Sequence, residues 1–141
     1  MSFPGWISVH THIGPLPIED IVSKKLPVRI LTNNHGLNVW GTIQHYKSHP
    51  PQTLIRFVLT NGTCIETTPE QKIYTAKKGY VSAQQITEKD RIVTLRGLSH
   101  FKYESPTSIE YIPTPYRTHE LVIVEHHTYF TKNILVKDTM V

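Results

Sequence analysis

Short runs of apolar and β-branched residues, separated by turn residues, constrain the fold of this chain more than any other feature. Few stretches of helical length repeat their apolar residues with the period of an amphipathic helix. Strand-like runs occupy Ile7–Ile13, Val28–Thr32, Asn38–Tyr46, Thr53–Thr60, Cys64–Thr67, Ile73–Thr75, Arg91–Thr94, His119–Glu125 and Tyr129–Val136. One short amphipathic piece, Pro17–Ile21, lies between the first two. The sequence therefore predicts an all-β chain.

Glycine, proline and asparagine mark the places where these strands end. Asn61-Gly62 lies between two strand-like runs and is the strongest hairpin signal in the sequence. Gly14-Pro15 predicts a turn after the first strand, and Asn33–Gly36 predicts another. Lys47–Pro51 ends in two prolines and predicts a break, because proline cannot donate a hydrogen bond to a strand ladder.

The stretch Gly97–Tyr116 has the weakest pattern in the chain. It contains three prolines and no sustained alternation of apolar and polar residues. We interpret it as a surface connection between two halves of the β-structure, because connecting segments run over the surface and tolerate an irregular backbone.

Two segments of the chain resemble each other. Ile18–Thr32 and Ala83–Thr94 both run from a short helical turn through lysine into an Arg-Ile-apolar-Thr strand. One interpretation is a pair of related β-subdomains about a pseudo-twofold axis, and the other is chance similarity.

Length and composition indicate one folded domain. The chain has 141 residues, of which 38% are hydrophobic and 18% charged, enough apolar side chains for a core of its own. The N-terminus lacks the pattern of a signal peptide, and no apolar run approaches the length of a membrane span. We therefore expect a soluble, cytoplasmic, monomeric protein with no membrane partner.

Charge and cysteine content exclude other classes of site. The net charge is +4, but the lysines and arginines are spread along the chain, which favours solubility over nucleic-acid binding. A single cysteine, Cys64, excludes an internal disulfide framework and any zinc site with several cysteines. In its hairpin, Cys64 is expected to be a small buried or half-buried side chain. No cofactor is expected.

Histidines and tryptophans offer further candidates. His10 and His12 fall on one face of the first strand, so they either form half of a metal site with the later pair His126-His127 or are solvent-exposed strand residues. Trp6 and Trp40 are candidates for the core, and Trp6 would alternatively shield a site next to Ser2.

The C-terminal stretch His119–Val141 carries the most specific pattern. It holds an acid, a hydrophobic run, a histidine, an aromatic pair and a hydrophobic triplet, followed by three polar residues. In order these are Glu120, Leu121–Val124, His127, Tyr129-Phe130, Ile134–Val136, Lys137, Asp138 and Thr139. The order and spacing resemble the C-terminal splicing motif of inteins and the wider Hint family. Two positions differ, because that motif has histidine and asparagine where this chain has Lys137 and Asp138.

Two other motifs extend the resemblance over the chain. Inteins begin with cysteine or serine, then a strand, a threonine, a glycine turn and an apolar pair; the matching residues are Ser2, Thr11, Gly14 and Ile18–Ile21. The middle motif of the family, Thr-x-x-His followed by an apolar pair and threonine, resembles Thr68–Thr75, with Gly79-Tyr80 following. In this motif Gln71 stands where the family has histidine.

The resemblance implies a Hint fold, a horseshoe of β-strands with pseudo-twofold related β-subdomains. It implies a serine-initiated mini-intein at residues 2–138, with residue 1 and residues 139–141 belonging to the flanking segments. The stretch after Gly97, where larger inteins carry a homing endonuclease, has no room for one. The N-terminal sequence also resembles inteins of phage family-B DNA polymerases. The expected partners are the flanking host-protein segments, or a complementary fragment if the intein is split.

The resemblance also implies roles for single residues. Splicing begins with an N–O acyl shift at Ser2, and Thr68 with nearby backbone N–H groups would stabilise the oxyanion. Gln71 donates a hydrogen bond but transfers no proton near pH 7. Either another group replaces the family's histidine, with His10, His12 and Lys72 as candidates, or the first step is slow.

The later steps of splicing would use the C-terminal motif. Thr139 would receive the upstream segment, His127 would carry protons at the junctions, and Glu120 would orient or polarise this machinery. Asp138 cannot cyclise as asparagine does. It either replaces an original asparagine and blocks release, or is a natural variant that cleaves by an anhydride-like route; Ser2 is likewise native or a replaced cysteine. Lys137 favours a natural variant.

Two other functions stay open at this point. A Hint domain that only cleaves its flanks would use the same residues without joining the segments. An inert, basic, β-rich binding module would keep the motifs as remnants. Splicing, or cleavage alone, would be a single turnover on the protein's own chain, without a cofactor.

Overall fold

The prediction of an all-β chain is confirmed by a computed structural model, which describes residues 2–139. Within this range all strands join one antiparallel 13-stranded sheet. The strands are β1 (Phe3–Pro4), β2 (Ser8–Thr11), β3 (Gly14–Pro17), β4 (Arg29–Asn34), β5 (Leu37–Leu59), β6 (Cys64–Thr67), β7 (Lys72–Thr75), β8 (Gly79–Ser82), β9 (Ile92–Arg96), β10 (His100–Glu104), β11 (Pro106–Ile123), β12 (Thr128–Thr131) and β13 (Ile134–Lys137). The helix α1 (Ile18–Ser23) and the 3₁₀ turn η1 (Ala83–Gln85) complete the elements of this range.

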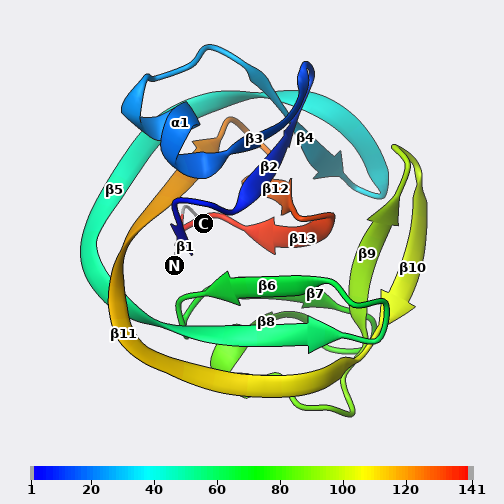
Figure 1. Cartoon of the computed structure of the whole chain (residues 1–141). Helices are drawn as coiled ribbons and strands as arrows, with labels where there is room; N and C mark the ends of the chain where they lie inside the picture. The colour runs from blue at the N-terminus through cyan, green and yellow to red at the C-terminus, as the bar shows by residue number, and fades with distance from the viewer. Residues whose placement is uncertain (1, 140–141) are drawn as a thin grey trace.

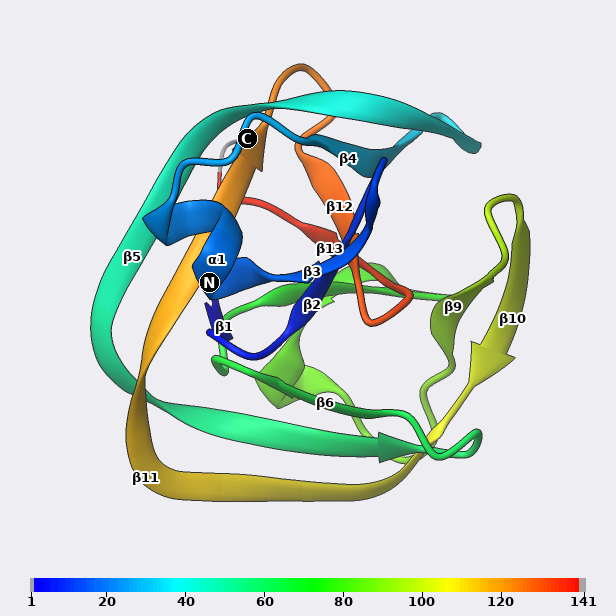
Figure 2. The same ribbon diagram turned by 45° about the horizontal axis from the view of Figure 1, so that its top comes forward.

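Two long strands, β5 and β11, curve around the outside of the molecule and give it a horseshoe outline (Figure 1). They pair antiparallel over most of their length, from Pro106 opposite Leu59 to Ile123 opposite Ile43. Most of the shorter strands lie inside this frame, whereas β9 and β10 lie at its open side. The strands nearest the two ends of the sequence, β1 and β13, both lie inside it (Figures 1 and 2). The frame therefore brings the two ends of the sequence towards each other.

The predicted break at Lys47–Pro51 is wrong, because β5 continues through it. Thr118 of β11 pairs with His49 and Tyr116 pairs with Gln52, so the register shifts where the two prolines lie. Pro50 and Pro51 are exposed and occupy this irregularity, where no ladder hydrogen bond is required of them.

The prediction of a surface connection at Gly97–Tyr116 is also wrong. This stretch forms β10 and the first half of β11. Most side chains of that half are exposed or half-exposed, so no alternation of apolar and polar residues marks it as a strand. Its order comes from pairing with β5, a long-range contact that local sequence does not reveal.

The hairpin at Asn61-Gly62 is confirmed and joins β5 to β6. Gly62 has φ +85°, a left-handed conformation that glycine adopts at little cost. The strand expected at Tyr129–Val136 is instead two strands, β12 and β13, joined at Lys132 and Asn133 with φ of 46° and 67°. Two consecutive left-handed residues make the tight turn that suits a two-residue hairpin.

The other boundaries shift by a few residues. The strand expected at Ile7–Ile13 is β2, which ends at Thr11, and the chain turns at His12-Ile13 before β3 starts at Gly14. The two similar segments do share a local form, since α1 leads to β4 and η1 leads to β9. The pseudo-twofold relation between them stays a prediction.

The main core collects buried side chains from strands of both halves, and its largest members include Phe3, Phe57 and Tyr129. The prediction that Trp6 and Trp40 belong to it is wrong, because they are 46% and 39% exposed. No helix in the described range is long and apolar enough to cross a membrane.

Candidate active site

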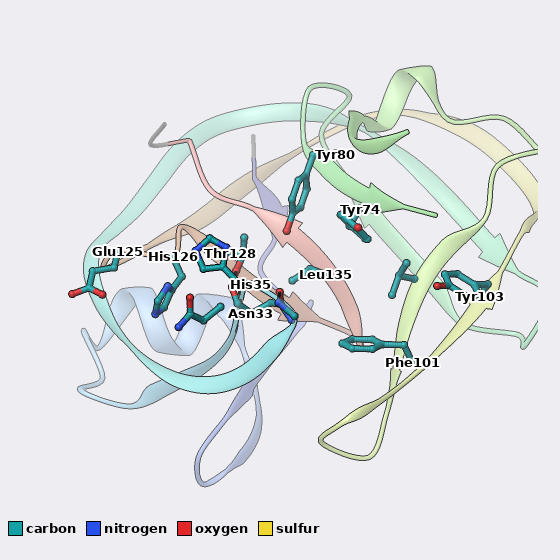
Figure 3. Close-up of a pocket in the computed structure, with 13 residues that line it drawn as sticks. Asn33, His35, Tyr74, Tyr80, Phe101, Tyr103, Glu125, His126, Thr128 and Leu135 are labelled. Carbon is teal, nitrogen blue, oxygen red and sulfur yellow. Dashed lines mark hydrogen bonds between the residues drawn. The ribbon is translucent and has the colours of Figure 1, made fainter. Parts of the chain in front are cut away.

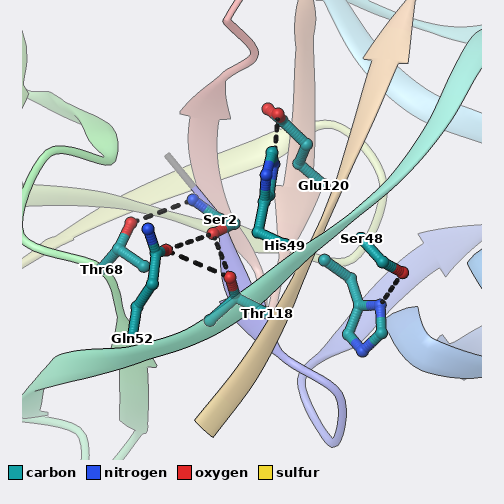
Figure 4. Close-up of polar contacts among 8 residues, drawn as sticks. Ser2, Ser48, His49, Gln52, Thr68, Thr118 and Glu120 are labelled. Carbon is teal, nitrogen blue, oxygen red and sulfur yellow. Dashed lines mark hydrogen bonds and ion pairs between the residues drawn. The ribbon is translucent and has the colours of Figure 1, made fainter. Parts of the chain in front are cut away.

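Ser2 is fully buried, although it lies at the start of the chain. Its Oγ donates a hydrogen bond to Thr118 Oγ1 at 2.7 Å and lies 3.4 Å from Gln52 Oε1 (Figure 4). Its backbone N–H donates to Thr68 Oγ1 at 3.0 Å. β1, paired with β11 through Phe3 and Pro4, holds the serine in this place.

Thr67 and Thr68, where β6 ends, hold the backbone of Ser2 from the other side. The Ser2 carbonyl accepts the Thr68 N–H at 3.1 Å and the Thr67 hydroxyl at 3.1 Å. The described contact of the Thr68 side chain is thus with the nitrogen of Ser2, the atom that leaves in an acyl shift. An oxyanion role for Thr68 concerns the carbonyl of Met1, which lies outside the described residues.

Gln71 is buried and points to the other end of the chain. Its Nε2 donates to the carbonyl of Lys137 at 2.8 Å and to that of Lys72 at 3.2 Å. A side-chain amide has two N–H donors, so these bonds engage both. The backbone N–H of Gln71 bonds to the Thr68 carbonyl, so one short segment connects the contacts of Ser2 with those of Lys137.

Asp138 is buried between the end of β11 and His127. Its Oδ2 accepts the Ile123 N–H at 2.9 Å and lies 3.2 Å from His127 Nδ1. The Asp138 N–H in turn bonds to the His127 carbonyl at 2.8 Å. His127 has φ +55° in the turn before β12, a conformation that non-glycine residues adopt rarely. The structure thus brings His127 to Asp138, as the C-terminal motif implied.

Lys137 and Thr139 flank that aspartate. The Lys137 ammonium lies 5.9 Å from the centre of the Tyr80 ring, within the range of a cation–π contact. The Thr139 hydroxyl is buried and makes no hydrogen bond with another described residue.

Glu120 faces the same region from β11. One of its oxygens, Oε1, lies 2.8 Å from His49 Nε2, whereas Oε2 is buried without a hydrogen bond to the described residues (Figure 4). One residue earlier on each strand, His119 Nδ1 lies 2.9 Å from Ser48 Oγ. Desolvation by burial holds the pKa of His119 below the ordinary value for histidine.

Three residues of this site escaped the sequence motifs: His49, Gln52 and Thr118. They lie on β5 and β11 where the two strands pair, and they touch Ser2 or Glu120. No local pattern would have found them, because the register of two strands some seventy residues apart in sequence brings them together. Lys72 is one of the candidates to replace the family's histidine. Its described contact with Gln71 is through its backbone carbonyl, which accepts a hydrogen bond from the Gln71 side chain.

The histidines of the first strand pack elsewhere. His10 and His12 lie against Trp40, with ring centres 6.2 and 6.4 Å from it, and His12 Nδ1 accepts the Arg29 N–H. Among residues 2–139, no three histidine, cysteine or acidic side chains gather as a metal site would require. Cys64 is half-buried, as expected.

An open pocket of about 540 Å³ lies away from these contacts (Figure 3). Tyr74, Tyr80, Phe101 and His126 are among the side chains that line it. None of the candidate catalytic residues does: Ser2, Thr68, Gln71, Glu120, His127, Lys137, Asp138 and Thr139. His126 thus faces a different surface from His127, which contacts Asp138.

Comparison with known proteins supports the fold. No family model and no curated protein matches the sequence. Among solved structures, the chain is similar to a DnaB intein from Synechocystis sp. (14% identity, 99% of each chain, TM-score 0.88). It is also similar to a DnaX mini-intein from Spirulina platensis (19% identity, 98% of this chain and 100% of that chain, TM-score 0.82) and to a bacterial intein-like domain from Clostridium thermocellum (17%, 97% and 98%, TM-score 0.83). The chain therefore has the Hint fold of the inteins.

Proposed function

We propose that this protein excises itself from a longer chain and joins the flanking segments, the reaction called protein splicing. One observation carries the proposal: the segment from Thr67 to Gln71 contacts both ends of the domain. Thr68 bonds to Ser2 and Gln71 bonds to Lys137, two residues that are 135 positions apart. Joining two flanks requires both junctions at one site, and this contact supports such a site.

In the first step Ser2 Oγ attacks the carbonyl of the preceding residue and turns a peptide bond into an ester. The serine is buried and hydrogen-bonded to Thr118, which fixes the direction of its hydroxyl. Thr68 Oγ1 holds the nitrogen that leaves. Positioning of this kind supplies much of the rate enhancement in intramolecular reactions.

The later steps use the C-terminal junction. Thr139 Oγ1 would attack the ester and take over the upstream segment, and its freedom from hydrogen bonds to the described residues suits a nucleophile. His127, in contact with residue 138, would exchange protons as the bond before Thr139 breaks. Asp138 lacks the amide nitrogen that closes the ring on an asparagine, so release is the step that this chain performs slowly or not at all.

This assignment makes residues 2–138 the excised domain and Thr139 the first residue of the downstream segment. Met1, Met140 and Val141, assigned to the flanks, lie outside the described residues. Serine as the first nucleophile and a DNA polymerase as host are parts of the same proposal. The partners are the flanking segments, or a complementary fragment in a split form.

A fusion with two different flanking proteins tests the proposal. In the Asp138→Asn variant we expect two products by gel and mass spectrometry, the joined flanks and the free domain, beside residual precursor. Separate flanks without a joined product would indicate a domain that only cleaves. Unchanged precursor would contradict both activities and favour an inert module.

The nucleophile is checked with a second substitution in the same fusion. Asp138→Asn with Ser2→Ala should give no joined flanks, because no ester forms. Joined flanks from this double variant would remove Ser2 from the mechanism. Thr63→Ala, a change at the tip of the hairpin between β5 and β6, serves as a control that should leave splicing unchanged.

A further inference from the structure

The first step needs a group that exchanges a proton, and Gln71 is not that group. Its side-chain amide neither gains nor loses a proton near pH 7, and both of its donors are engaged by the carbonyls of Lys72 and Lys137. The following inference rests on the proposed splicing function and asks which residue performs this task.

The register of β5 and β11 places an imidazole on the same side of the sheet as Ser2. Thr118 and Glu120 are two positions apart on β11, so their side chains point to the same face. Thr118 bonds to Ser2 Oγ, and Glu120 bonds to His49. His49 is itself the residue directly opposite Thr118 on β5. The imidazole therefore shares a face with the Ser2–Thr118 hydroxyl pair (Figure 4).

Burial distinguishes the two members of the pair. The Glu120 side chain is 3% exposed and that of His49 is 34% exposed. The second oxygen of Glu120 makes no hydrogen bond with the described residues. Within this range, His49 is therefore the hydrogen-bond partner of the buried carboxylate. A buried carboxylate that holds one ring nitrogen fixes the orientation of an imidazole that still reaches solvent.

We propose that His49, positioned by Glu120, exchanges the proton of the N–O acyl shift. The neutral imidazole accepts the Ser2 hydroxyl proton as the bond from Oγ to the carbonyl carbon forms. The bond from that carbon to the Ser2 nitrogen then breaks, and the imidazolium returns the proton to this nitrogen. One proton leaves oxygen and one reaches nitrogen, so the step is balanced without another reactant.

Several charged groups surround this pair and enter its pH dependence. Glu120 contacts His49 directly, and Lys47 is paired with Glu120 across the two strands. His119, next to Glu120, is influenced electrostatically by His49, by Arg117 of β11 and by Glu19 of α1.

The test measures ester formation at Ser2 in the unmodified sequence fused to an upstream protein. At neutral pH hydroxylamine cleaves an ester far faster than a peptide bond, so the rate of upstream release reports the first step. His49→Gln should lower this rate about 10²-fold, the usual contribution of a positioned acid or base. His45→Gln, an exposed histidine of the same strand, is the matched control and should keep the rate.

A structural role would not change the pH profile or respond to added base, so two further readouts separate the alternatives. The unmodified protein should lose rate as pH is lowered, because a protonated imidazole cannot accept the Ser2 proton, whereas His49→Gln should lack this dependence. Added imidazole should restore rate to His49→Ala. Equal rates and pH profiles in His49→Gln and the unmodified protein would overturn the role of His49 and leave splicing intact. No ester in the unmodified protein would overturn both.

Discussion

At the scale of single residues, the C-terminal junction depends on a contact between two side chains. Asp138 accepts a backbone N–H from Ile123 and faces His127 Nδ1, so residue 138 is held from two sides. In the proposed mechanism, an asparagine there would keep an oxygen for the Ile123 N–H and gain the nitrogen that attacks the main chain. The histidine beside it would exchange the proton.

His127→Ala in the Asp138→Asn background should slow C-terminal release by roughly 10²-fold or more, because it removes the imidazole in contact with residue 138. Release is followed by mass spectrometry of the downstream segment. His126→Ala is the control, since the neighbouring histidine faces the pocket on another surface. Equal slowing by both changes would indicate damage to the turn rather than loss of a proton carrier.

Burial of His119 predicts a pH-dependent stability. Its pKa is lowered in the folded protein and about 6.5 in the unfolded chain, so the unfolded state binds the proton more readily. The stabilising contribution is complete above about pH 6.5 and is lost as pH falls through the lowered folded pKa. Thermal unfolding from pH 7.5 down to pH 5 should show this loss.

The corresponding substitution checks the assignment. His119→Gln keeps a polar group near Ser48 and should flatten the decline of the unfolding temperature over that range. His45→Gln, at an exposed position, should not. An unchanged decline in His119→Gln would show that other groups govern the acid side of the stability curve.

At the scale of elements, the long pair β5–β11 forms both the frame of the horseshoe and one wall of the site. The structure packs β5 tightly against its neighbours at Gly41, where an added Cβ would lie 2.9 Å from Thr32 Cγ2 and 3.0 Å from Ile123 Cγ2. Ile123 is also the residue whose N–H holds Asp138. Packing in the frame and geometry at the junction are therefore connected.

Gly41→Ala should destabilise the protein by about 1–3 kcal/mol, the usual cost of overpacking a tight site. Denaturant unfolding measures the effect. Thr42→Ala, at the next and exposed position, is the control and should cost less than about 0.5 kcal/mol. A Gly41→Ala variant as stable as the Thr42→Ala variant would contradict the tight packing between β4, β5 and β11.

The same pair of strands shows why part of the fold and site was predictable and part was not. Short strands with turn residues at their ends, such as β6 after Asn61-Gly62, follow from local sequence. Ser2, Glu120 and His127 were found by motif. β11 is exposed on both faces over its first half, and β5 carries prolines at an irregularity, so neither has a strand pattern there. The site residues on this pair, His49 among them, depend on a long-range register.

At the scale of the whole molecule, the turn at Gly97–Ser99 between β9 and β10 is the place to divide the chain. Gly97 has φ +64° and Leu98 is 54% exposed, so few contacts are lost there. The second part would contain β10 to β13, and its β11 would have to pair again with β5 of the first part. The extent of the β5–β11 pairing favours reassociation.

Fragments 1–97 and 98–141, each fused to a flank and the second carrying Asp138→Asn, should associate and join the flanks in trans. Co-purification and the mass of the joined product measure this. Leu121→Asp, in the buried part of β11, should abolish association, whereas Tyr111→Asp, which is 65% exposed before substitution, should not. Association that survives Leu121→Asp would contradict the role given to this pairing.

The central claim, that Ser2 forms an ester at a site shared by both ends of the chain, is tested most directly without changing Asp138. The unmodified domain fused to an upstream protein is treated with hydroxylamine near neutral pH, and the mass of the released protein is measured by mass spectrometry. We predict release of the upstream protein as its hydroxamate, with the break immediately before Ser2, and no release from Ser2→Ala. An unmodified fusion that stays intact, or a Ser2→Ala fusion that releases the same product, would contradict the claim.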